Sequence, residues 1–259
     1  EATAQAATPV PPNPTPTTTL PPTVTPIAPT PTHTVTATPV ATTLSTAQLV
    51  ERLEASVVLI VTTRFDGTSG SGTGIIYSAD GLVLTNMHVV AGAISVSVMV
   101  TDSTGRQSVV AAELLGSDSD LDLAVIRLED GTYVPARFGS VEDIALGDEV
   151  VALGYPLVDE TKGSLTVTKG IVSSIRNDGL RDVIQHQASI NPGNSGGPLV
   201  SSDGLVVGVN TYILRRSQDV NIEGFNMAVT IDEAVSRIEQ LETEAFVAVS
   251  ADALFSSGL

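Results

Sequence analysis

Hydrophobic and polar positions alternate along much of residues 56–230, in short stretches separated by turn sequences. An alternation with a period of two is typical of strands that bury one face. The turns at 79–81, 177–179 and 202–204 each place Gly after Asp, which suits tight connections between antiparallel strands. We expect strands at 56–64, 72–78, 82–86, 94–101, 107–115, 122–128, 149–154, 164–175, 182–189, 198–201, 205–211 and 224–230.

The strand pattern stops near residue 128 and resumes near 148, so the strands fall into two halves. Each half supplies about six strands, the number expected for a small closed antiparallel barrel. We therefore predict an all-β fold of two six-stranded antiparallel barrels, one at about 56–128 and one at about 148–230, bridged by 129–147.

Short helices are expected at both ends of this barrel region. Ser45 precedes Gln48 by three positions, and Thr230 precedes Glu233 in the same way, which is the pattern of a helix-capping box. Apolar residues then recur at helical spacing, namely Leu49, Val50 and Leu53 after the first box and Ala234, Val235, Ile238 and Leu241 after the second. The pattern weakens after Thr243, so residues 244–259 are assigned as a C-terminal tail for which no element is predicted.

Residues 1–46 have a different composition. They hold eleven of the 15 prolines, sixteen threonines and a single acidic residue, Glu1. Such a segment has no apolar face to bury, so residues 1–45 are predicted to be extended and disordered. Tracts rich in threonine and proline are typical of surface stalks, some of them O-glycosylated, although a plain linker fits the same composition. Residues 46–243 remain for the folded domain.

Charge and missing residue types restrict the class of function. The net charge is −17, which disfavours binding to the phosphates of nucleic acid. Without cysteine there is no disulfide or thiolate metal site, and the acidic residues lack calcium-loop spacing, so neither a metal nor an organic cofactor is expected. No apolar run is long enough to span a membrane. The chain starts at Glu1 without a leader, which favours an extracytoplasmic protein after signal removal, or a trimmed chain.

The run Asn-Pro-Gly-Asn-Ser-Gly-Gly-Pro-Leu at 191–199 is the most informative sequence in the chain. Its glycines allow sharp turns and leave room for a substrate carbonyl. Ser195 can then present its hydroxyl while the amides of Gly193 and Ser195 converge on one point. Two convergent N–H donors are what a developing oxyanion needs. Taken alone, the run also fits a glycine-rich turn without chemistry.

A nucleophilic serine needs a nearby base. The chain has three histidines. His33 falls in the predicted stalk, and His186 falls inside a predicted strand, where a histidine on the polar face is the ordinary outcome. His88 follows the strand at 82–86, at a loop-end position where functional groups gather. His88 is therefore the candidate base.

The base in turn needs a group that orients it. Strand alternation places Asp122 on the same face as Ala124, Ile126 and Leu128, so we expect it to be buried and to need a partner. An imidazole N–H is a suitable partner. Asp118 and Asp120 lie in a polar run and are interpreted as solvated loop acids.

The order His88, Asp122, Ser195 is that of the chymotrypsin arrangement, with the serine in the second half of the domain. The segments that carry these residues resemble the protease domain of the HtrA/DegP family of trypsin-like serine endopeptidases. The matching segments, in order, are 70–74, 85–90, 122–125, 147–150, 152–156, 191–199 and 224–228. The resemblance covers roughly residues 46–242.

The resemblance implies that His88 is the general base, Asp122 its orienting partner and Ser195 the nucleophile of acyl transfer. It implies an oxyanion hole made by the amides of Gly193 and Ser195, with Asn194. The implied substrate pocket comprises Ser189, Ile190, Val209, Asn210, Thr211 and Ala228. Since position 189 carries no acid and Ile190 would narrow the pocket, we expect cleavage after small aliphatic residues.

The chain departs from the family pattern near both ends. About seventeen residues follow Glu242, which is too few for the PDZ domain that many members carry. The family's trimer-forming segment corresponds here to the threonine- and proline-rich stalk, so the choice between monomer and trimer stays open. We expect a serine endopeptidase that acts on protein or peptide substrates in extracytoplasmic quality control or processing. The alternatives are a silent or latent protease-fold module for binding or surface display, and an acidic β domain without chemistry.

Overall fold

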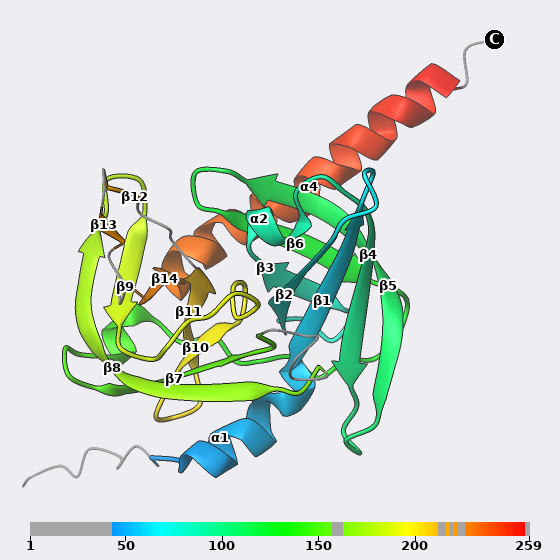
Figure 1. The fold of residues 1–259 in the computed structure, drawn as a ribbon. Coiled ribbons are helices and arrows are strands. Elements are labelled where there is room, and N and C mark those ends of the chain that lie inside the picture. The colour runs from blue at the N-terminus through cyan, green and yellow to red at the C-terminus, as the bar shows by residue number, and fades with distance from the viewer. Residues whose placement is uncertain (1–42, 157–162, 212–215, 218–219, 222–225, 257–259) are drawn as a thin grey trace, which may run out of the picture. The chain divides into compact units, whose positions relative to one another are not determined.

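The computed structural model describes residues 43–156, 163–211, 216–217, 220–221 and 226–256 (Figure 1). All of them belong to one compact unit that begins at Ala41. Residues 1–42, and with them nearly all of the predicted stalk, lie outside the described residues.

Two closed six-stranded barrels form the body of this unit, which confirms the predicted fold class (Figure 1). Neighbouring strands in the first barrel follow the order β1-β2-β3-β6-β5-β4, and those in the second follow β10-β11-β14-β9-β8-β7. The first barrel contains β1 (Val57–Arg64), β2 (Ser69–Ile76), β3 (Leu82–Thr85), β4 (Ala93–Thr101), β5 (Gln107–Asp118) and β6 (Leu123–Leu128). The second contains β7 (Glu149–Gly154), β8 (Thr166–Asn177), β9 (Asp182–His186), β10 (Pro198–Ser201), β11 (Val206–Thr211) and β14 (Asn226–Thr230). A separate pair, β12 (Arg216–Ser217) and β13 (Val220–Asn221), forms a two-stranded sheet.

Aliphatic residues from both barrels meet in one buried cluster. Ile75 and Leu84 come from the first barrel, Val209 and Val229 from the second, and Ile238 from the C-terminal helix. Burial of such a side chain contributes about 1.5–3 kcal/mol. The cluster therefore holds the two barrels against each other.

The N-terminal helix α1 (Thr46–Leu53) begins as the sequence predicts. Ser45 Oγ accepts the Gln48 N–H at 3.3 Å, and the Gln48 side chain accepts the Ser45 N–H at 2.9 Å. Leu49 and Leu53 of this helix are buried with residues of β1, β7 and β10. Two short 3₁₀ helices lie elsewhere in the described chain, at Glu54–Ser56 and Val141–Asp143.

The C-terminal helix α4 (Ile231–Ser256) packs mainly against β5 and β11, and so contacts both barrels (Figure 1). The Thr230 hydroxyl accepts the Glu233 N–H at 3.3 Å, as the capping pattern predicts. Val235, one of the apolar residues at helical spacing, is exposed, and the helix continues to Ser256, into the predicted C-terminal tail.

Among the described residues, no helix is both long enough and apolar enough to cross a membrane.

Candidate active site

His88 lies on α2 (Met87–Val90), the single-turn helix that follows β3. Its ring Nδ1 is 2.8 Å from Asp122 Oδ2, and its backbone N–H donates to Asp122 Oδ1 at 3.0 Å. The side chain of His88 is 46% exposed and that of Asp122 is 19% exposed, so the pair opens to solvent on the histidine side. One carboxylate thus fixes both the backbone and the ring of His88, and the second ring nitrogen, Nε2, makes no hydrogen bond within the described residues.

Asp122 does not lie in a strand, contrary to the expectation from the alternating pattern, because β6 begins one residue later at Leu123. Its φ is +56°, and no other non-glycine residue in the described part of the chain has a positive φ. Its carbonyl accepts hydrogen bonds from Asn86 Nδ2 at 2.9 Å and from the Met87 N–H at 3.1 Å. The left-handed backbone allows the carbonyl and the carboxylate of one residue to contact the same segment, 86–88.

The Asp122 carboxylate is stabilised in its ionised form. Burial opposes ionisation, but the hydrogen bonds and charge of His88 and a 3.0 Å hydrogen bond from the Thr211 hydroxyl outweigh that effect. Together they lower the pKa of Asp122 below the usual value of an aspartate. Because Thr211 ends β11, the second barrel contributes directly to this carboxylate.

Ser195 lies in the loop between β9 and β10, and a glycine next to it allows the loop to approach His88. Gly196 has φ +82°, a conformation that only glycine adopts without strain. A Cβ there would clash with the Thr85 hydroxyl and would lie 3.0 Å from the Asn86 nitrogen. The serine loop therefore lies against the end of β3, three residues before His88.

The serine loop approaches the segment before His88, but no hydrogen bond joins the two side chains among the described residues. Ser195 is 4% exposed, and within the described residues no hydrogen bond joins its hydroxyl to the ring of His88. Contacts of this kind are often long before substrate binds. The structure thus forms the predicted histidine–aspartate contact and places the serine loop against the end of β3, without a hydrogen bond between Ser195 and His88 among the described residues.

Two of the three amides predicted for the oxyanion hole are unpaired. The N–H groups of Gly193 and Ser195 donate to no acceptor among the described residues. The N–H of Asn194 donates to the Asn191 carbonyl at 3.0 Å. The Asn194 amide thus closes the turn, which sets it apart from the other two.

The six predicted pocket residues divide between different surroundings. Ile190 and Ala228 are buried in the same apolar cluster, and the Ile190 N–H donates to Asn226 Oδ1 at 3.0 Å. Ser189 is exposed, and its carbonyl accepts the Thr168 hydroxyl at 2.9 Å.

The three predicted pocket residues on β11 face different ways. Val209 belongs to the buried cluster between the barrels. Asn210 is buried and donates through Nδ2 to the Pro198 carbonyl at 2.8 Å. The Thr211 hydroxyl is directed to Asp122, where it supports the carboxylate.

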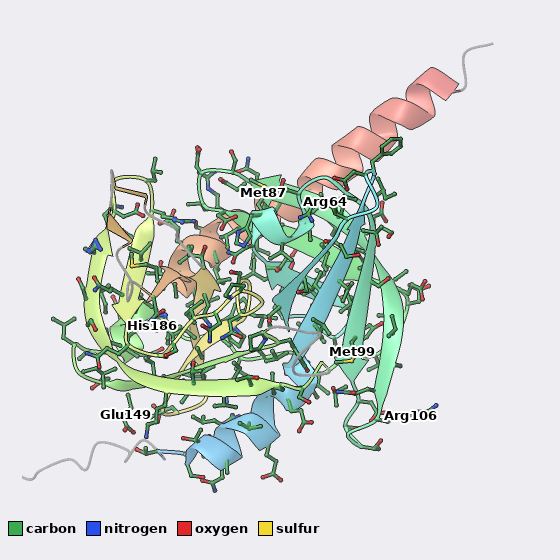
Figure 2. The ribbon with its side chains drawn as sticks, viewed as in Figure 1. Arg64, Met87, Met99, Arg106, Glu149 and His186 are labelled. Carbon is green, nitrogen blue, oxygen red and sulfur yellow. The ribbon has the colours of Figure 1, made fainter. Side chains whose placement is uncertain are left out.

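His186 ends β9 in the second barrel (Figure 2) and is 1% exposed, so the expectation of a polar-face histidine was wrong. Neither ring nitrogen makes a hydrogen bond within the described residues. Burial lowers the pKa of His186 to about 4, an effect that the Ala188 backbone and the Asn210 side chain partly offset. The ring is neutral at physiological pH and takes no part in the hydrogen bonds around Asp122. His33 lies outside the described residues.

Asp118 is more than a solvated acid, because its Oδ1 accepts the N–H groups of Asp120 and Leu121 at 2.9 and 3.0 Å. The Leu121 carbonyl in turn accepts a hydrogen bond from the guanidinium of Arg181, a buried residue at the end of the β8–β9 turn. Both peptide groups that lead into Asp122 are therefore held by charged side chains. Nothing in the sequence pattern connects Arg181 with Leu121, so this contact could not be predicted.

Across the ranges that the structure describes, no group of three or more His, Cys, Asp or Glu residues could hold a metal ion.

The sequence has recognisable relatives. A family model described as a trypsin-like peptidase domain matches residues 72–209, which is more than half of the chain. The serine protease Do-like HtrA of Bacillus subtilis (strain 168) is 39% identical over 189 residues, or 68% of this chain and 40% of that protein. A probable periplasmic serine endoprotease DegP-like of Halomonas elongata is 39% identical over 181 residues, or 68% of this chain and 36% of that protein. The chain spans less than half the length of these two curated relatives.

Solved structures give the same result. A structure titled HtrA-type protease AlgW with tripeptide has a TM-score of 0.66 and 36% identity, covering 77% of this chain and 64% of that chain. The crystal structure of Deg5 has a TM-score of 0.65 and 29% identity, covering 77% of this chain and 94% of that chain. The chain belongs to the trypsin-like peptidase family and is similar to the HtrA/DegP serine proteases within it.

Proposed function

We propose that this chain is a serine endopeptidase in which Ser195 is the nucleophile, His88 the general base and Asp122 the group that orients His88. The 2.8 Å contact between His88 Nδ1 and Asp122 Oδ2 is the observation that carries the proposal. It leaves Nε2 of His88 to receive the serine proton. We also propose that residues 46–243 form the protease domain, on a stalk formed by 1–45.

In the acylation step, Ser195 Oγ attacks the carbonyl carbon of the scissile peptide bond while its proton passes to His88 Nε2. The carbonyl oxygen becomes an oxyanion and accepts hydrogen bonds from the amides of Gly193 and Ser195. When the C–N bond breaks, His88 gives the proton to the leaving amine. The ionised Asp122 stabilises the imidazolium that exists between these two transfers.

In the deacylation step, water replaces the amine. His88 takes a proton from water, the hydroxide oxygen attacks the acyl carbon, and the ester bond to Ser195 breaks. The proton returns to Ser195 Oγ, and a carboxylic acid product leaves. Each turnover consumes one peptide bond and one water, and it requires no group beyond the side chains and amides named here.

The proposed substrates are proteins or peptides cleaved after small aliphatic residues such as valine or alanine. Two buried apolar residues, Ile190 and Ala228, support this choice. The residue at 189, where a basic side chain would need a negative partner, is a serine. Profiling with a peptide library tests the preference, and strong cleavage after lysine or arginine contradicts it.

The proposed location is extracytoplasmic, where the enzyme would act in quality control or in processing. The support comes from relatives named as periplasmic DegP-like proteases and from the stalk-like composition of residues 1–45.

A latent form of the same enzyme is the second candidate. The open contact between Ser195 and His88 favours it, because a resting enzyme would need substrate or an activating peptide to close that hydrogen bond. A latent enzyme would use the same chemistry, but it would be active only after substrate or an activating peptide binds.

Labelling with a fluorophosphonate probe tests the proposed function. We expect one adduct on the wild-type protein, located at Ser195, and none on Ser195→Ala. The assay should be run with and without peptide activators and at elevated temperature, so that a latent enzyme also reacts. An unlabelled wild type under all of these conditions, or equal labelling of Ser195→Ala, contradicts the proposal.

A further inference from the structure

Thr73, on β2 of the first barrel, is fully buried against the serine loop of the second barrel. Its hydroxyl donates to the Gly193 carbonyl at 2.7 Å and accepts the Tyr155 N–H at 3.0 Å. Its backbone N–H donates to the Ser195 carbonyl at 2.8 Å. One residue of the first barrel thus binds two carbonyl groups of the loop that carries the proposed nucleophile.

Thr73 binds the carbonyl groups of residues 193 and 195, and other residues bind the N–H groups of residues 194 and 196. The Asn194 N–H donates to Asn191 at 3.0 Å, and the Gly196 N–H donates to Asn210 at 2.8 Å. The peptide units 193–194 and 195–196 are therefore each held at both ends, once by Thr73 and once by the second barrel. The Ser195 N–H lies between these held units and the Gly193 N–H lies just before them, and neither makes a hydrogen bond among the described residues.

The Thr73 hydroxyl has no other acceptor and a fixed position. Tyr155 N–H supplies its incoming hydrogen bond, so its own proton is directed to Gly193. The Thr73 carbonyl accepts the Thr85 hydroxyl at 2.7 Å, which ties the same residue to the end of β3, close to α2. Thr73 is thereby fixed relative to His88 as well as to the serine loop.

We propose that Thr73 is a positioning residue for the oxyanion hole: its hydroxyl holds the Gly193 carbonyl so that the Gly193 and Ser195 amides converge on the substrate oxygen. The inference rests on the proposed function and deepens it. Gly193 has φ +102° and no side chain, so its carbonyl is held by this hydrogen bond and by the bond from the Asn194 N–H to Asn191 at the other end of the same peptide unit. Without the hydroxyl, the loop at 192–194 gains other orientations, and the two amides share a target only part of the time.

The test compares Thr73→Val, which keeps the shape and loses the hydroxyl, with Thr73→Ser, which keeps the hydroxyl. Loss of one oxyanion donor typically costs about 10²–10³ in rate, so partial loss of its orientation in Thr73→Val should lower kcat by roughly 10- to 100-fold. KM should stay within about threefold of wild type because substrate binding before attack does not use the hole. Thr73→Ser should stay within about threefold of wild type in kcat.

A second readout is specific to the hole. A peptide boronate forms a tetrahedral adduct on Ser195 whose oxygen occupies the oxyanion position, so its affinity should fall in parallel with kcat/KM in Thr73→Val. The affinity of the corresponding product peptide, which places no oxyanion there, should not change.

Thr62→Val is the matched control. It removes an equally buried hydroxyl from the neighbouring strand β1, and this hydroxyl contacts Val89 rather than the serine loop.

The outcomes separate this inference from the proposed function. If wild type is not labelled at Ser195, the proposed function fails. If wild type is active and Thr73→Val keeps kcat and boronate affinity within threefold, or Thr73→Ser loses as much as Thr73→Val, the role of Thr73 is refuted. If Thr73→Val does not fold, Thr73→Ser and Thr73→Ala, which differ only by the hydroxyl, give the same comparison.

Discussion

The hydroxyl of Thr211 donates a 3.0 Å hydrogen bond to Asp122 Oδ2, the same oxygen that faces His88 Nδ1. Thr211 belongs to the second barrel, and Asp122 and His88 belong to the first. The orientation of the histidine therefore depends on the packing of the two barrels against each other, in addition to the local structure around α2.

Replacing Thr211 by valine should weaken catalysis without unfolding the protein. A hydrogen bond to a charged group contributes about 1.5–3 kcal/mol, so its loss should lower kcat by at least about tenfold if the bond is needed in the transition state. Steady-state kinetics on a peptide substrate measures the change. Thr63→Val is a suitable control, since the Thr63 side chain makes no hydrogen bond among the described residues. A Thr211→Val enzyme with wild-type kcat would show that Asp122 needs no support from β11.

Replacing Asp122 by asparagine should lower kcat by about 10⁴, because the amide favours the wrong tautomer of the histidine and cannot stabilise its cation. The change should also remove a pH-dependent part of the stability. The pKa of Asp122 is lowered in the folded protein, so the carboxylate stabilises the fold above the unfolded pKa of about 3.9 and loses this effect as pH falls through the folded value. Thermal unfolding of both proteins from neutral to acid pH measures this. A difference in stability that grows as pH falls contradicts the account.

The glycine at 196 provides a test of the close approach between the serine loop and β3. Gly196→Ala adds a Cβ that clashes with the Thr73 carbonyl and the Thr85 hydroxyl, and it places alanine at φ +82°. Gly105→Ala is the matched control, because its φ is +79° but its Cβ would meet nothing within 4 Å. The left-handed conformation costs both variants about 1–2 kcal/mol, and overpacking should cost Gly196→Ala about 1–3 kcal/mol more. Equal losses in denaturant unfolding would show that the loop does not press on β3.

Acid should destabilise the protein through His186. Its pKa is about 4 in the folded protein, against an ordinary value near 6.5, so the unfolded chain binds a proton more readily between these pH values. Stability is then complete above about pH 6.5 and falls as pH decreases to about 4, by a total on the order of 3 kcal/mol. His186→Leu should flatten this limb of the stability curve. Gln185→Leu, at the neighbouring position of β9, should leave the limb in place, and an unchanged limb in His186→Leu would contradict the prediction.

The barrels could be predicted from sequence because a closed sheet buries one face, so apolar and polar residues alternate along each strand. His88, Asp122 and Ser195 could be found because few residue types perform their chemistry, and because Ser195 lies in a glycine-rich run, His88 follows a predicted strand and Asp122 opens one. The chain order of the three then indicated two barrels with a site between them.

The contacts that support these residues could not be predicted, because each joins segments that are distant in sequence. Thr73 meets Gly193 and Arg181 meets Leu121 only after both barrels have closed and packed. Alternation also misplaced Asp122, since a left-handed residue just before a strand shifts the side chain off the face that a period of two assigns to it. On β11 the pattern marked a buried strand without showing which residues face Asp122 and which face the core between the barrels.

The central claim, that an alcohol on the serine loop becomes covalently acylated during peptide hydrolysis, is tested most directly by trapping the intermediate. The enzyme is mixed with a peptide ester, quenched in acid during turnover, digested and examined by mass spectrometry. The account predicts the acyl group on the peptide that contains Ser195, and no such adduct in His88→Ala. Turnover of the ester by the wild type with no acyl group on Ser195, or with the acyl group on another residue, would contradict it.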